Sequence, residues 1–219
     1  MRYKVIGSGL ALLFMLAGCG EPTQQLEDLP WQVTVSPEGN SQVFHLQTGK
    51  TTLKEAIERF HSFPELAVFS HESGKRHLEA YFGKLTLGVF EAKLLLELQA
   101  DDATLTNLQQ ASSKREGMAS GQWKFEVAEA SLPVVNNLVV RKVVYMPAID
   151  YAPDIVTARF GAPAEKIASA QKGVEYWFYP QKGLAILLNS AGGDLFYYTD
   201  AQHYAALKQE LLESKPTHD

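Results

Sequence analysis

The chain has 219 residues, of which 46% are hydrophobic and 21% are charged, and its formal net charge at pH 7 is −5. Enough apolar and aromatic side chains are present for a packed core, and no long segment has the composition of a disordered chain. The acidic net charge argues against a nucleic-acid partner and against direct adhesion to anionic lipid.

The N-terminal segment has the features of a cleaved signal. A basic start, Met1-Arg2-Tyr3-Lys4, precedes twelve apolar residues, Val5–Leu16, whereas crossing a bilayer takes about 20. Leu16-Ala17-Gly18-Cys19 follows and resembles the lipobox of bacterial lipoproteins, in which the chain is cut before the cysteine and the cysteine is acylated. We expect a signal peptide at 1–18 and lipidation of Cys19; the alternative is a free cysteine or a chance match.

The residues after Cys19 bear on localisation. Gly20, rather than an aspartate, follows the cysteine, which under enteric-type sorting implies the periplasmic face of the outer membrane, with the inner membrane as the alternative. Residues 19–30 are expected to form a lipidated polar tether, and its last ten residues, extended, reach about 35 Å. Cys19 is the single cysteine, so no internal disulfide is expected.

The first half of the remaining chain predicts a hairpin, a helix, strands and a second helix. Trp31–Val35 and Gln42–Leu46 alternate around a turn, and Thr52 with Glu55 forms a capping box for a helix ending near Pro64. Three strand candidates and a helix capped by Asp101 or Asp102 follow; the strands are His77–Phe82, Leu85–Val89 and Glu91–Gln99.

The second half repeats much of that order. Strands are expected at Trp123–Val127 and Leu138–Met146, and Pro153 opens a helix that Gly161-Ala162-Pro163 ends. Three further strands precede a final helix capped by Asp200; they are Val174–Tyr179, Leu184–Asn189 and Asp194–Thr199.

Matching positions in the two halves lie 99 to 100 residues apart, as in Phe60 with Phe160 and Asp101 with Asp200. The sequence therefore predicts an α+β fold of two similar units, residues 31–117 and 118–219. Each unit is expected to contain a short helix, an antiparallel sheet of three to four strands and a C-terminal helix.

The second half also resembles a known family. The stretches RFGAP, GVEYWFYPQKGLAILL and GGDLFYY are similar to small outer-membrane lipoproteins of the SmpA/OmlA type, which include a component of the β-barrel assembly machinery. The matching positions are Gly161, Pro163, Trp177, Tyr179 and Gly183, of which the glycines and the proline are structural. The resemblance implies a non-catalytic lipoprotein that binds a partner.

The motifs that could support catalysis are incomplete. TGKTT at 48–52 lacks the first glycine of a phosphate loop, because that position is Phe44. His71, Glu72 and His77 could meet across a turn, but a solvated loop explains them better than a metal site. Neither a G-x-S-x-G motif nor a cysteine in the mature chain supplies a nucleophile. We expect no enzyme activity, no cofactor and no metal.

One feature of the second half points to binding. Strand Val174–Tyr179 is apolar on both faces, with Tyr176 and Phe178 on one side and Trp177 and Tyr179 on the other. One face can be covered by the unit's own helices, and the other must meet the first unit or a partner. Trp177, Tyr179 and Tyr197 are the candidate partner-binding residues, since Trp and Tyr dominate binding hot spots.

The sequence thus predicts a lipid-anchored periplasmic protein that acts through protein contacts in envelope assembly or maintenance. The alternative is a carrier or sensor that binds a small apolar ligand or a glycan in an aromatic cleft between the units. A hydrolase without a recognisable motif is the weakest of the three interpretations.

Overall fold

Strand pairing dominates the structure. The computed structural model describes residues 27–213; the expected signal peptide 1–18, Cys19 and the tether as far as residue 26 lie outside the described residues. Ten strands form one antiparallel sheet in the order β10-β11-β12-β13-β9-β6-β5-β4-β8-β7. In chain order these strands are β4 (Glu65–Ser70), β5 (Arg76–Leu87), β6 (Phe90–Leu98), β7 (Arg115–Gly117), β8 (Trp123–Glu126), β9 (Val140–Pro147), β10 (Glu165–Ala168), β11 (Val174–Tyr179), β12 (Leu184–Asn189) and β13 (Leu195–Thr199).

A small sheet and short helices pack around the large sheet. The small sheet has three strands in the order β1-β2-β3, which are β1 (Thr34–Val35), β2 (Ser41–Val43) and β3 (Leu46–Gln47). The α-helices are α1 (Leu53–Phe60), α2 (Asp102–Ala111), α3 (Leu132–Val135), α4 (Pro153–Phe160) and α5 (Tyr204–Glu213). Two 3-10 turns occupy Glu129–Ser131 and Pro180–Lys182.

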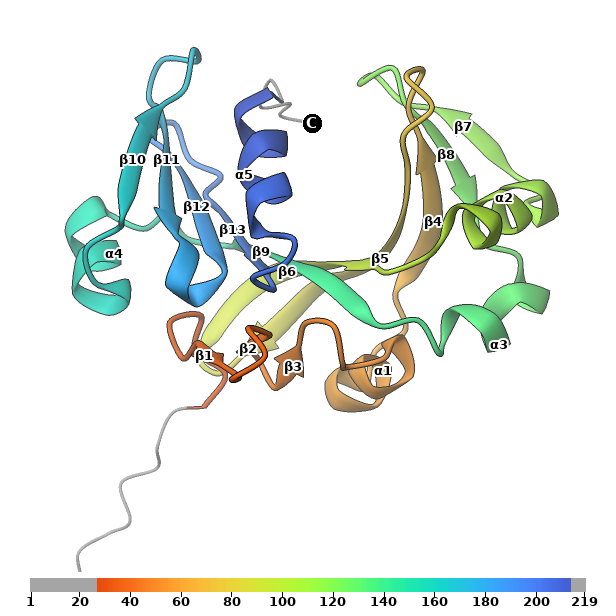
Figure 1. The fold of residues 1–219 in the computed structure, drawn as a ribbon, viewed down its shortest axis with the longest axis horizontal. Coiled ribbons are helices and arrows are strands. Elements are labelled where there is room, and N and C mark those ends of the chain that lie inside the picture. Colours follow the sequence, from red (N-terminus) through yellow and green to blue (C-terminus); the bar gives the residue numbers. More distant parts are fainter. Residues whose placement is uncertain (1–26, 214–219) are drawn as a thin grey trace, which may run out of the picture.

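The large sheet is bent into a U (Figure 1). Strands β10–β13 form one arm, β9, β6 and the end of β5 form the floor, and the start of β5 with β4, β8 and β7 forms the other arm. Helix α5 lies inside the U, against the β10–β13 arm. The small sheet, α1 and α4 lie outside it. We call the side that faces α5 the inner face and the opposite side the outer face.

A bulge interrupts β5, the strand that runs from one arm of the U into its floor (Figure 1). The pairing with β6 shifts between Tyr81 and Gly83, so that Phe82 is an extra residue. Gly83 has a φ of 63°, a left-handed conformation that glycine adopts without steric cost. Because a bulge bends and twists the strand that carries it, this extra residue contributes to the curvature of the sheet.

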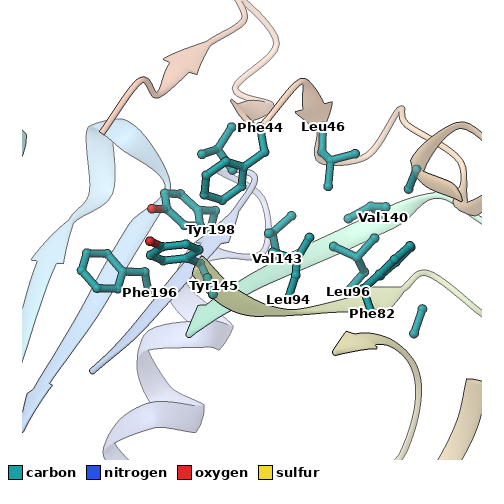
Figure 2. Packing of buried hydrophobic residues seen from close by; sticks show 14 of the residues in the cluster. Phe44, Leu46, Phe82, Leu94, Leu96, Val140, Val143, Tyr145, Phe196 and Tyr198 are labelled. Atoms are coloured by element: carbon teal, nitrogen blue, oxygen red, sulfur yellow. The ribbon is translucent and has the colours of Figure 1, made fainter. Parts of the chain in front are cut away.

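The main core fills the space between the outer face and the elements outside it. On β6 the buried side chains alternate as expected, with Ala92, Leu94, Leu96 and Leu98 on the outer face. Figure 2 shows outer-face side chains of β6, β9 and β13 meeting Phe44 and Leu46 of the small sheet. Full burial of one such aliphatic side chain stabilises the fold by about 1.5–3 kcal/mol.

The turn that inserts Phe44 into this core is strained. Phe44 and His45 join β2 to β3 with φ values of 52° and 61°, the conformation of a type I′ turn, which usually carries Asn or Gly. The ring of Phe44 is buried, 5.2 Å from the ring of Tyr145 and 6.2 Å from that of Tyr198. Burial of the ring offsets the cost of the backbone conformation.

The end of the expected tether belongs to the folded part. Leu29 and Pro30 are buried, and the hydroxyl of Tyr198 donates a hydrogen bond of 2.8 Å to the carbonyl oxygen of Pro30. Leu29 and Pro30 therefore belong to the fold rather than to the expected tether 19–30.

The expected α+β fold of two similar units is wrong. The chain is mostly β, and strands from both halves alternate in one sheet: β9 pairs with β6, and β8 pairs with β4 and β7. The expected boundary between residues 117 and 118 falls inside the hairpin β7–β8. Hydrogen bonding across the sheet joins the two halves, so neither half has a sheet of its own.

Most individual elements lie where the sequence placed them. The capping box at Thr52 is confirmed, with its hydroxyl accepting from the Glu55 amide at 3.3 Å, and β11 and β12 have the expected bounds. The sequence prediction did not include β4, β7, β10 or α3, and its single strand Gln42–Leu46 is two strands, β2 and β3, joined by the turn at Phe44 and His45. It also divided β5 into two strands, because the bulge interrupts the alternation.

Gly183 allows one close contact on which the packing depends. It has a φ of 59°, and a Cβ at this position would overlap the carbonyl oxygen of Thr199 and the hydroxyl of Ser41. Gly183→Ala should therefore destabilise the protein by roughly 3–5 kcal/mol, combining left-handed strain with overpacking. Gly74→Ala is the control, because Gly74 has a φ of 83° with nothing within 4 Å, and should cost about 1–2 kcal/mol. Urea unfolding measures both, and equal losses would contradict the contact.

Candidate functional site

The inner face is covered in one part and open in another. Under α5, the inner-face side chains Tyr176, Phe178 and Leu187 are buried against Tyr204 and Leu207 of the helix. Beyond α5, no helix or strand of residues 27–213 lies over the inner face of β6, β5, β4 and β8 (Figure 1). The open inner face is therefore the main candidate for a binding surface.

Strand register identifies the side chains that form this surface. Paired residues of antiparallel strands share a face, and Tyr81 pairs with Leu95, Leu95 with Val144 and Val144 with Tyr197. These four residues form an apolar row that runs from the open arm to the edge of α5. Tyr81 and Leu95 are half-buried, whereas outer-face neighbours such as Leu94 are fully buried.

A charged row runs beside the apolar row. Ala67 pairs with Glu79, Glu79 with Glu97 and Glu97 with Lys142. Glu97 is only 4% exposed, and its carboxylate contacts both the guanidinium of Arg141 and, at 2.6 Å, the Lys142 ammonium. Two cations reach one carboxylate because the β6–β9 register shifts at Arg141, as a bulge re-aims neighbouring side chains.

This charge cluster also fixes the edge of α5. The Lys142 ammonium lies 3.1 Å from a carboxylate oxygen of Glu210 on α5. Lys142 thus links the sheet, through Glu97, to the helix. The carboxylates Glu79 and Glu97 lie directly opposite each other, an unfavourable pair of like charges that the neighbouring cations offset.

The end of the open arm adds an aromatic pair. The rings of Phe69 and His77 are stacked with centroids 5.5 Å apart, and Nε2 of His77 lies 2.9 Å from a carboxylate oxygen of Glu79. Phe69 pairs on its other side with Lys124 of β8. The open inner face therefore combines half-buried aromatic side chains with charges of both signs.

Trp177 and Tyr179, the predicted partner-binding residues, are core residues. They lie on the side of β11 opposite Tyr176 and Phe178, as expected, but Trp177 is 1% exposed. Lys166 lies over the indole ring, with Nζ 3.5 Å from the centroid. Of the two alternatives for this face, burial against the rest of the fold therefore holds, because neighbouring elements cover both faces of β11.

Tyr179 is also held inside the fold, whereas Tyr197 is half-buried beside α5. The hydroxyl of Tyr179 donates to the carbonyl oxygen of Gly161 at 3.2 Å, and its ring lies 6.2 Å from that of Phe160 on α4. Burial raises the pKa of Tyr179 to about 12. Burial also raises the pKa of Tyr197, the member of the apolar row that packs beside α5.

The structural positions named from the family resemblance have specific geometries. Gly161 is the C-cap of α4 with a φ of 85°, Pro163 follows it, and Gly183 makes the close contact described above.

Two shallow depressions lie on the outer side, around the strained turn at His45. Their volumes are about 330 Å³ and 240 Å³. His45 Nε2 lies 3.6 Å from a carboxylate oxygen of Asp28, and Asp28 also contacts Arg59. These contacts attach the start of the folded chain to α1, so a structural role explains them.

Residues 27–213 contain neither a metal-ligating cluster nor a helix that could span a membrane. No group of three or more His, Cys, Asp and Glu side chains there could hold a metal ion. Among those residues, no helix has the length and apolar character needed to cross a membrane.

Sequence reasoning missed the open inner face because it did not identify β4. The stretch ELAVFS alternates, with Ala67 and Phe69 on the inner face and Leu66 and Val68 on the other. It is bounded by Pro64 and by the turn HESGK, both recognisable strand limits. The signal was therefore present, although the sequence could not indicate that the face would stay open.

The charge cluster can be tested by removing its central charge. Glu97→Gln keeps the side-chain shape but leaves Arg141 and Lys142 without their shared carboxylate, so we expect a loss of about 1–3 kcal/mol in stability. Glu126→Gln is the matched control, because Glu126 and Lys114 form an exposed pair at 3.2 Å and such pairs contribute at most about 1 kcal/mol. Guanidinium unfolding compares the two, and a Glu97→Gln loss no larger than the control would show that the cluster is not stabilising.

Comparison of the chain with protein-family models, with curated proteins and with solved structures found no match.

Proposed function

We propose that this protein is a lipid-anchored lipoprotein of the bacterial envelope that binds a protein partner on its open inner face, in envelope assembly or maintenance. The observation that carries the proposal is the contrast between the two faces of β5 and β6. Leu78 and Leu94 on the outer face are fully buried, whereas Tyr81 and Leu95 on the inner face retain exposure. Apolar exposure of this kind on an uncovered sheet face is typical of a binding surface.

The composition of the surface supports a protein rather than a small ligand. A small-molecule site is a concave pocket that encloses most of its ligand, whereas the inner face is a row of aromatic and aliphatic side chains beside a row of charges. The ligand-carrier alternative required an aromatic cleft between two units, but the two halves share one sheet, and Tyr179 and Phe196 each pack against Phe160.

The size of the surface limits the kind of complex. Five adjacent strands, β9 to β8, span about 19 Å at about 4.8 Å per strand, and six residues along a strand span about 20 Å. The resulting area of about 400 Å² is roughly half of what one partner contributes to a standard interface. A stable partner would therefore also contact α5 or the hairpin ends, and a smaller one would bind transiently.

The lipid anchor rests on the lipobox at 16–19 and on the resemblance of the second half to small outer-membrane lipoproteins. One acyl chain binds a membrane marginally, while two or more hold a protein stably. The proposed location is the periplasmic face of the outer membrane.

Cys19→Ser tests the anchor. We expect loss of membrane retention and of palmitate labelling, because the chain contains no other cysteine to acylate. Gly20→Asp is the control: it should remain labelled and membrane-bound but move to the inner-membrane fraction. Palmitate labelling of the Cys19→Ser protein at the wild-type level would overturn the anchor.

Site-specific cross-linking tests the partner surface. A photoreactive p-benzoylphenylalanine at Phe69 or Tyr81 should give discrete protein adducts in intact cells. The same group at Phe63, which is 88% exposed and lies in the α1–β4 loop, is the matched control. Similar adducts from Phe63, or none from both inner-face positions in variants that melt like the wild type, would reject the inner face as the binding surface.

A further inference from the structure

Exposed apolar side chains gather at one corner of the molecule. Val89, in the turn between β5 and β6, is 58% exposed, and Ile149, just after β9, is 56% exposed. The amide of Ala148 donates to the carbonyl oxygen of Glu91 at 3.0 Å, which continues the β6–β9 pairing past the end of β9. Ile149 therefore directly follows the residue bonded to Glu91, and Val89 and Phe90 directly precede Glu91 on the facing strand.

The first described residues of the chain pack at the same corner. Trp31 is half-buried, and its ring meets that of Phe90 edge-on at 5.7 Å. The guanidinium of Arg159 on α4 lies 4.7 Å from the centroid of the Trp31 ring. Gly88, next to Val89, packs so closely against the backbone carbonyl of Glu27 that a Cβ would overlap it. The contacts of Trp31 thus join the start of the folded chain to β6 and to α4, which lies on the left in Figure 1.

We define the entry corner as Trp31, Val89, Phe90, Ile149 and Arg159. Its distance from the proposed anchor is short, because Glu27 is the eighth residue after Cys19 and the chain between them can span at most about 28 Å. The following inference rests on the proposed lipid anchor. If Cys19 is embedded in a membrane, the entry corner is the part of the fold that the chain holds next to it.

We propose that the entry corner contacts the phospholipid surface beside the acylated Cys19. Its residue types suit that role: tryptophan favours the interface between headgroups and acyl chains, aliphatic side chains insert at that boundary, and arginine can reach the phosphates.

The acidic residues around the entry corner indicate which class of phospholipid it would contact. Glu27, Asp150 and Asp154 are exposed near the corner, and they disfavour an anionic surface. The corner therefore fits zwitterionic phospholipid.

The contact determines which way the binding surface points. The open inner face lies on the side of the sheet opposite β1, and the U opens away from the small sheet (Figure 1). A protein held at its entry corner as well as by its acyl chains has a preferred orientation. In that orientation the inner face is turned away from the bilayer, accessible to a partner.

Membrane-depth measurements test the contact. Because Cys19 is acylated in the lipidated protein, Val89→Cys or Ile149→Cys introduces a single free thiol for an NBD fluorophore. The lipidated full chain is reconstituted into vesicles of phosphatidylcholine and phosphatidylethanolamine that contain nitroxide-labelled lipid. Leu212→Cys is the control, since Leu212 is 43% exposed on α5, away from the corner. NBD at Val89 and Ile149 should be blue-shifted and quenched at least twofold more than NBD at Leu212.

Each other outcome overturns the contact in a distinguishable way. Vesicle flotation without quenching at Val89 and Ile149 would leave the anchor standing and remove the contact. Failure of the protein to float would remove the anchor and, with it, the basis of the contact. Quenching that occurs only with anionic lipid would contradict the charge argument. If NBD at both positions is blue-shifted in native membranes but not in pure lipid vesicles, the entry corner contacts a protein instead.

Discussion

The pairing of β6 with β9 is the interaction on which the rest of the structure depends. It places a strand from the first half of the chain beside a strand from the second, from Ala92 opposite Pro147 to Leu98 opposite Val140. On the outer face this pair supplies Leu94, Leu96, Val143 and Tyr145 to the main core. Without it, the β10–β13 arm and the β4–β8 arm would be two separate sheets with exposed edges, which are prone to aggregation.

The two faces of the β6–β9 pair have different surroundings. The outer face is closed by the small sheet and the helices outside the U, and the strained turn at Phe44 is stabilised by the ring that it buries. The inner face carries the charge cluster of Glu97, Arg141 and Lys142, which attaches α5 on one side and leaves the other side open. The same floor therefore supports both the core and the candidate binding surface.

The sequence predicted local elements well and their assembly poorly. The capping box at Thr52 and the helix opened by Pro153 are local devices, since each depends on side chains within one turn, and both are present. The alternation of Glu91–Gln99 correctly gave one covered face. The alternation does not identify the neighbouring strand, because any strand with the same alternation could pair with this one. The similar order of elements in the two halves therefore led to two expected sheets where one exists.

For the candidate binding surface, too, the local features followed from the sequence, whereas the exposure of its side chains did not. The sequence by itself determined the LAGC stretch that resembles a lipobox, the period of the strands and the caps of the first two helices, because these depend on residues close together in the chain. Burial of Trp177 and Tyr179, which looked available for a partner, was decided by α4 and Lys166. Exposure of Tyr81 and Leu95, which drew no attention in the sequence, was decided by the position of α5 and by the bulge at Phe82. Only the tertiary structure could decide these, because the exposure of a side chain depends on which distant segment packs over it.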